Sequence, residues 1–73
     1  MENINARLLE SEMVKNGVTI KEISNELNIA ETTFYRKLNG VSDFYRREIA
    51  KIVEILKLTR EDTDKIFFKN VFA

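Results

Sequence analysis

Apolar residues recur at helical spacing along most of the 73-residue chain, and no proline interrupts them. The strongest breaks in this pattern are the two glycines, Gly17 and Gly40. A chain of this length forms one domain with a small core. We therefore expect residues 1–73 to form a single all-α domain, a compact bundle of four to five short helices.

The composition excludes several kinds of chemistry. The chain has no cysteine and no histidine, which removes disulfides, a thiol nucleophile and the usual zinc ligands. The remaining residues offer neither a nucleophile with its base nor a carboxylate pair. We expect no metal, no cofactor and no enzymatic activity.

We expect no export signal and no membrane anchor at the amino terminus. "MENINARLLE" lacks both a basic start and an apolar run. No apolar stretch approaches the roughly 18 residues needed to span a bilayer. A soluble protein of the cytoplasm is the expectation.

Charge is unevenly distributed in a chain whose net charge is zero. Residues 1–34 sum to −3 and residues 35–51 sum to +3. The zero total argues against coating of nucleic acid by bulk attraction. By charge alone, the basic segment 35–51 is also compatible with ordinary solvated helix faces.

The first half of the chain predicts two helices with clear boundaries. A first helix should run from Asn3 to Asn16, with Gly17 as its carboxyl-terminal cap. Thr19 and Glu22 have the spacing of a capping box, so a second helix should begin at Thr19 or Ile20.

A tight turn then leads directly to a third helix. Asn28 and Ile29 leave room for only a short connection before Phe34 and Leu38, which are spaced i and i+4. Gly40 closes this helix. In the second helix, Ser24 is small enough to let a neighbouring helix approach closely.

The second half predicts a fourth helix and a less certain terminal segment. The fourth helix should run from Phe44 or Tyr45 to Lys57. Thr59 then offers another cap. Residues 60–73 fit either a fifth helix or an extended segment, because three phenylalanines and a valine suit both.

The third helix presents an unusual polar face. If Phe34 and Leu38 face the core, the helical rotation of about 100° per residue places Arg36 on the opposite side. Hydrogen-bonding residues flank it, namely Thr32, Thr33 and Asn39. Threonine has modest helix propensity, so this face favours contact with a partner over plain solvation.

Residues 19–40, "TIKEISNELNIAETTFYRKLNG", resemble the helix-turn-helix of the phage Cro and repressor family of DNA-binding proteins. The following "VSDFYRREIAKIVEILKLT" is similar to the loop and fourth helix of that family, and "EDTDKIFF" to the start of its fifth. The resemblance thus covers roughly residues 4–68. It implies a lambda-repressor-like fold with the helix-turn-helix at about 19–39.

The resemblance also implies roles for particular side chains. The helix at 31–39 would enter the major groove, with Arg36 donating to guanine O6 and N7. The base-reading residues would be Glu31, Thr32, Thr33 and Arg36. The residues at the DNA backbone would be Lys21, Lys37, Asn39, Ser42, Tyr45 and Arg46, whereas Arg47 and Lys51 would face water.

Three positions depart from the family pattern. Ile20 stands where glutamine often meets phosphate, and that contact is then missing or supplied by Lys21. Ala30 stands where serine or threonine would cap the third helix, at a cost of ~1 kcal/mol. Glu31 suits the helix dipole but repels phosphate, so its use would be to accept from cytosine N4 or to reject wrong sites.

DNA binding would require two copies of so small a domain. One copy touches few base pairs, so we expect a homodimer, at least on a pseudo-palindromic operator. Either dimer contact or core packing would explain the aromatic surface near the carboxyl terminus. The residues concerned are Phe67, Phe68, Val71 and Phe72.

The expected function is a small Cro-like transcriptional repressor in the cytoplasm of a bacterial host, associated with the nucleoid when bound. The chain leaves no room for a ligand-sensing domain, so no small-molecule ligand is expected. The main alternative is a protein–protein interaction module, an antirepressor or regulator-binding domain built on the same helices.

Overall fold

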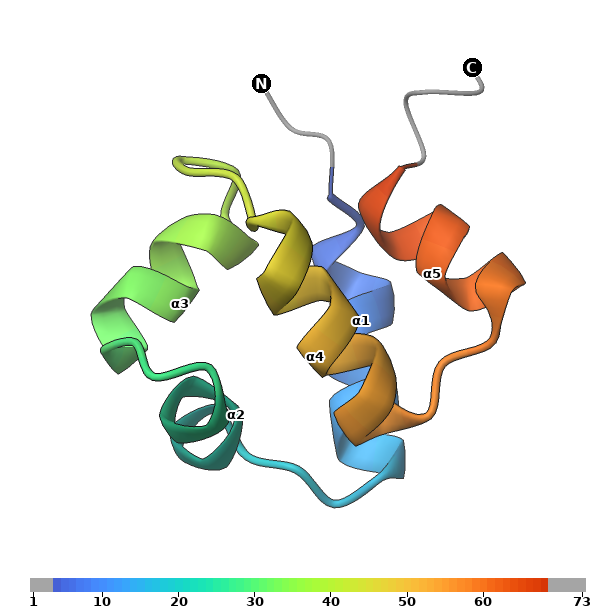
Figure 1. Cartoon of the computed structure of the whole chain (residues 1–73), viewed down its shortest axis with the longest axis horizontal. Coiled ribbons are helices and arrows are strands. Elements are labelled where there is room, and N and C mark those ends of the chain that lie inside the picture. The colour runs from blue at the N-terminus through green and yellow to red at the C-terminus, as the bar shows by residue number, and fades with distance from the viewer. Residues whose placement is uncertain (1–3, 69–73) are drawn as a thin grey trace.

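Helices account for most of the described part of the chain (Figure 1). The structure is a computed structural model that describes residues 4–68. Within this range it contains no strand and has five helices: α1 (Ala6–Lys15), α2 (Ile20–Glu26), α3 (Glu31–Leu38), α4 (Arg46–Leu56) and α5 (Arg60–Phe67). The all-α prediction is confirmed, and the uncertain terminal segment is helical as far as Phe67.

Side-chain caps define where three of these helices begin. Asn5 caps α1 and Thr59 caps α5, each through a side-chain oxygen that accepts a backbone N–H. At α2, Thr19 Oγ1 accepts from the backbone N of Glu22 at 3.1 Å, and Glu22 Oε1 accepts from the backbone N of Thr19 at 3.0 Å. The predicted capping box is therefore present.

Four helices end in the same way, in a residue with positive φ. These residues are Gly17 (67°), Asn28 (60°), Gly40 (81°) and Lys57 (53°). After each one, the next backbone N–H donates back into the last helical turn, as Val18 N does to Met13 O at 2.9 Å. This Schellman arrangement satisfies the terminal carbonyls and turns the chain sharply.

Each helix contributes to a single apolar core. Its buried members are Leu9, Met13, Ile23, Phe34, Leu38, Ile52, Leu56, Leu58, Ile66 and Phe67. The two ends of the described chain are also joined, because the backbone N of Asn5 donates to Ile66 O at 2.7 Å. Hence α5 is part of the fold and not an appendage.

A row of aromatic rings connects α3 to α5 through the loop between α3 and α4. The ring centroids of Phe34 and Phe44 are 5.6 Å apart, and those of Phe44 and Phe67 are also 5.6 Å apart. Both pairs meet edge to face, the arrangement that ring quadrupoles favour. Phe44 therefore anchors the loop to the core.

The helices divide into two sides, as Figure 1 shows. On one side lie α2 and α3, on the opposite side lies α5, and α1 and α4 lie between them. This arrangement leaves one face of α3 free at an edge of the molecule.

No helix within residues 4–68 has the length and apolar character needed to cross a membrane.

Candidate nucleic-acid interface

A tight connection joins α2 and α3 into a helix-turn-helix. Asn28 adopts the left-handed conformation that asparagine tolerates better than most residues. Its N–H donates to Asn25 O at 3.0 Å, and Ile29 N donates to Ser24 O at 3.0 Å. The chain thus ends α2 and begins α3 at Glu31 with only a few residues between.

Ser24 is, with Ile23, one of the two buried residues of α2. Its side chain is only 2% exposed, in agreement with the expectation that a small residue allows a neighbouring helix to approach. Its Oγ has no hydrogen-bond partner among the described residues. The small volume of Ser24, and not its hydroxyl, is therefore what the packing uses.

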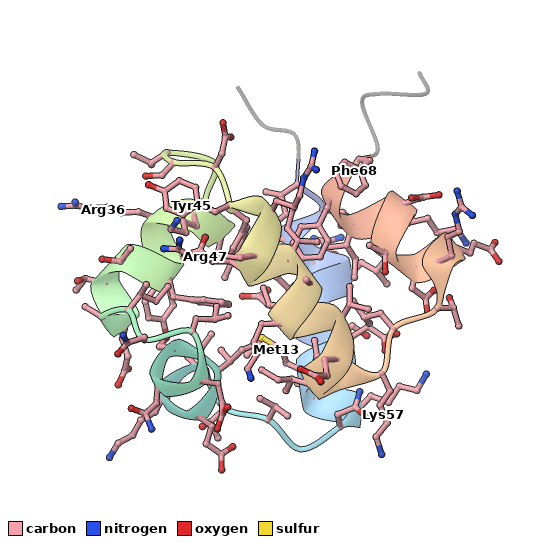
Figure 2. The ribbon with its side chains drawn as sticks, in the orientation of Figure 1. Met13, Arg36, Tyr45, Arg47, Lys57 and Phe68 are labelled. Atoms are coloured by element: carbon pink, nitrogen blue, oxygen red, sulfur yellow. The ribbon has the colours of Figure 1, made fainter. Side chains whose placement is uncertain are left out.

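Five side chains form a continuous exposed surface on α3 and its carboxyl end, which we call the outer face of α3. They are Glu31, Thr32, Tyr35, Arg36 and Asn39. On the other side of the helix, Phe34 and Leu38 are buried, as the spacing predicted. Figure 2 shows Arg36 extending outward from α3.

The predicted base-reading residues are not equally placed. Glu31, Thr32 and Arg36 belong to the outer face and are exposed, whereas Thr33 is only half-exposed at its border. Thr32 and Arg36 are spaced i and i+4, so their side chains lie on one stripe of the helix. Thr32 is therefore better placed than Thr33 to share a contact with Arg36.

Tyr35 was absent from the predicted site. It is 47% exposed and is spaced i and i+4 from both Glu31 and Asn39, which places it near the middle of the outer face. The helical rotation that selected Arg36 also places Tyr35 outside the core. The prediction from sequence singled out the hydrogen-bonding residues of this face and did not include Tyr35.

Lys37 requires a correction. It was predicted to contact the DNA backbone, but its side chain is 4% exposed. Its Nζ lies 2.8 Å from Glu48 Oε1 and donates to Asp43 O at 3.2 Å. With its ammonium group held inside the protein, Lys37 cannot reach a phosphate.

The other predicted backbone-contacting residues are exposed. They are Lys21, Asn39, Ser42, Tyr45 and Arg46. Ser42, Tyr45 and Arg46 lie in the loop after α3 and at the start of α4, next to the end of the outer face. This exposure is compatible with phosphate contact.

Burial of Lys37 leaves the charge of this region unchanged. Its partner Glu48 is buried with it, so one positive and one negative charge leave the surface together. The basic segment 35–51 keeps its sum of +3. The exposed cations that remain are Arg36, Arg46, Arg47 and Lys51.

The start of α3 has no side-chain cap, as the sequence predicted. Ala30 occupies the capping position with φ −72° and ψ 153°, and it accepts no N–H of the first turn through its side chain. Glu31, in that first turn, is acidic and exposed. The N–H groups of the first turn of α3 therefore receive no acceptor from a capping side chain.

The structure also changes the role expected for one of the predicted dimer residues. Phe67 is 7% exposed and belongs to the core, so packing within the monomer, and not dimer contact, is its use. Phe68 is half-buried against the same core. Val71 and Phe72 lie outside the described residues.

Comparison with known proteins supports the same motif. Residues 9–41 match the family model described as the helix-turn-helix domain of resolvase. This range includes most of α1 and all of α2 and α3. No curated protein and no solved structure gives a significant match.

The match and the geometry together support a helix-turn-helix domain of the DNA-binding kind. In such domains the second helix of the motif docks in the major groove. In this chain that helix is α3. The match does not single out the phage Cro and repressor type, which therefore stays a prediction.

Proposed function

We propose that this protein is a sequence-specific regulator of transcription that reads double-stranded DNA with α3. One observation carries the proposal: the second helix of the helix-turn-helix exposes a hydrogen-bonding outer face beside a basic surface. Major-groove reading needs such a helix, because each base pair presents its own pattern of donors and acceptors there.

Arg36 is the main base-reading residue in this proposal. Arg36 is exposed on the outer face, and its guanidinium has the fork geometry that matches guanine O6 and N7. Thr32, one turn earlier, supplies a hydroxyl and a methyl group. Glu31 would accept from cytosine N4 or disfavour other bases.

The residues beside the outer face would contact the phosphates. Arg46 is exposed in the first turn of α4, where its charge adds to the positive end of the helix dipole. Lys21 would serve the same purpose from α2. Asn39, Ser42 and Tyr45 would hydrogen-bond the backbone or nearby bases.

The kind of regulator we propose is a small Cro-like repressor that acts as a homodimer in the bacterial cytoplasm. A domain of 32 × 24 × 20 Å covers only a few base pairs. Pairing two copies on an inverted repeat doubles the sequence that is read.

A second function, protein–protein interaction, is favoured by one feature. Net charge is zero, and Tyr35 and Val41 expose apolar surface in or near α3, at 47% and 74%. Such a surface also suits a protein partner. An enzyme is not proposed, because the chain has neither histidine nor cysteine and no nucleophile is paired with a base.

Salt dependence of binding separates the two functions. The association constant is measured by titrating the protein into a fluorescent random-sequence duplex at several salt concentrations. The logarithm of this constant should fall linearly with the logarithm of the salt concentration, with a slope of about −0.9 for each phosphate neutralised. If the folded protein does not bind duplex DNA even at low salt, the DNA-binding proposal is overturned.

Repression is tested in cells with a reporter gene. A site selected in vitro is placed over the promoter, and expression is compared with and without the protein. We expect expression to fall with wild-type protein and to be restored with Arg36→Ala. A rise in expression would identify an activator instead.

A further inference from the structure

A buried ion pair links the recognition helix to the helix that follows it. Lys37 in α3 and Glu48 in α4 are each about 4% exposed, and Nζ lies 2.8 Å from Oε1. The same Oε1 accepts from the backbone N of Tyr45 at 2.8 Å, and Nζ also donates to Asp43 O. Three separate segments, α3, the loop and α4, therefore meet at one pair of charges.

Tyr45 lies directly over this pair. Lys37 Nζ is 3.9 Å from the centroid of its ring, and the Arg47 guanidinium carbon is 5.7 Å from the same centroid. These are distances at which a ring attracts a cation. Tyr45 is nevertheless 59% exposed, so its ring contacts the Lys37 ammonium while much of the ring stays available to a partner.

The stability of the fold does not by itself explain these charges. Taking two charges out of water is costly, and apolar residues of similar volume commonly replace a buried pair without loss of stability. What the pair adds is a fixed geometry, because an ammonium and a carboxylate with several partners accept few arrangements. The segment so fixed carries Ser42, Tyr45 and Arg46.

We propose that Lys37 and Glu48 are positioning residues, which hold loop 39–45 and the first turn of α4 in register with the outer face of α3. The inference rests on the proposed DNA binding. In this arrangement phosphate contacts from Tyr45 and Arg46 form together with base contacts from Arg36. Neither Lys37 nor Glu48 touches the DNA.

The test uses a double variant that leaves the net charge unchanged, Lys37→Met with Glu48→Gln. Glutamine keeps an oxygen that can accept from the backbone N of Tyr45. We expect a thermal unfolding midpoint close to that of wild type but DNA affinity at least about tenfold lower, because the phosphate contacts are no longer preorganised.

The dependence of DNA affinity on salt concentration is a second measurement, and a purely structural role of Lys37 and Glu48 would leave it unchanged. The salt slope is the magnitude of the slope of the logarithm of the association constant against the logarithm of the salt concentration. Loss of the Arg46 contact should lower the slope by about 0.9, although no exposed cation has been removed. Tyr45→Leu should weaken DNA binding when it is introduced into the wild-type protein. It should have little further effect in the double variant, because the effects of substitutions at coupled sites are not additive.

A matched control lies on the far side of the molecule. Lys65 and Glu61 of α5 form an exposed pair at 3.2 Å, and Lys65→Met with Glu61→Gln makes the same chemical change there. This control should bind DNA as wild type does. Equal affinity and slope for the Lys37/Glu48 double variant and wild type would overturn the positioning role while leaving DNA binding intact.

A single substitution covers the case in which the double variant does not fold. Glu48→Asp keeps both charges of the pair but withdraws the carboxylate by one methylene, so simple attraction to DNA predicts unchanged binding, whereas loss of positioning predicts weaker binding. Unchanged or tighter binding would overturn the proposal. If wild-type protein binds no duplex DNA, the proposed function and this inference are overturned together.

Discussion

Arg36 is the side chain whose replacement should change sequence preference most clearly. Arg36→Ala removes the guanidinium fork and should cost about 1–3 kcal/mol at one base position of the preferred site, with other positions affected less. Competition between the preferred duplex and duplexes changed at single positions measures this. Arg60→Ala, on the opposite side of the molecule in α5, is the matched control and should leave preference unchanged. A uniform loss across all sequences would mean that Arg36 binds phosphate.

Replacement of the buried Ser24 should change the stability of the fold. Its buried Oγ lacks a partner within residues 4–68, and alanine is the better helix former, so Ser24→Ala should raise the free energy of unfolding by roughly 0.5–2 kcal/mol. Urea denaturation measures the change. Ser11→Ala, at an exposed position of α1, reports the helix-propensity part alone. A loss of stability on Ser24→Ala would show that the hydroxyl is satisfied.

The sequence predicts whether a side chain is exposed or buried better for some residues than for others. Arg36 could be placed because its position depends only on helical rotation relative to Phe34 and Leu38. Lys37 could not, because its partner Glu48 is 11 residues away across a loop, and a lysine at the border of a helix face gives no sign that its charge is paired. Phe67 had the same difficulty, since its burial depends on Phe44.

At the scale of elements, the start of α3 can be strengthened. Ala30 has the extended backbone of a capping residue but no side-chain acceptor, so Ala30→Ser should raise the free energy of unfolding by about 0.5–2 kcal/mol. Thermal or urea unfolding measures it. The control Ala50→Ser, at an exposed position inside α4, should be slightly destabilising. An equal effect of both substitutions would contradict the capping argument.

Most helix boundaries were predictable because they are local, but α1 begins at Ala6, after its Asn5 cap, and not at Asn3 as predicted. The Thr19 capping box and the positive-φ residues Gly17 and Gly40 act within a few residues of the helix ends that they define. The start of α5 was also correct, at Thr59. Its continuation was left open because a terminal helix of this composition depends on packing against α1, which local sequence does not encode.

At the scale of the whole molecule, two copies should bind one operator on the same side of the duplex. Recognition helices of a symmetric pair lie about 34 Å apart, one turn of DNA, and one molecule has a longest extent of 32 Å, so neighbouring copies can meet. Inserting about five base pairs between half-sites rotates one copy by half a turn. We expect this insertion to abolish paired binding in a gel-shift titration. Unchanged binding would indicate that each copy acts alone.

The most direct measurement is selection of bound sequences from a random duplex DNA library at near-physiological salt, followed by sequencing of the enriched pool. We expect an enriched inverted repeat, with half-sites about one helical turn apart. With Arg36→Ala the preference at one position of each half-site should weaken, whereas with Arg60→Ala the full repeat should persist. Failure of folded wild-type protein to enrich any sequence would contradict the claim that the outer face of α3 reads DNA.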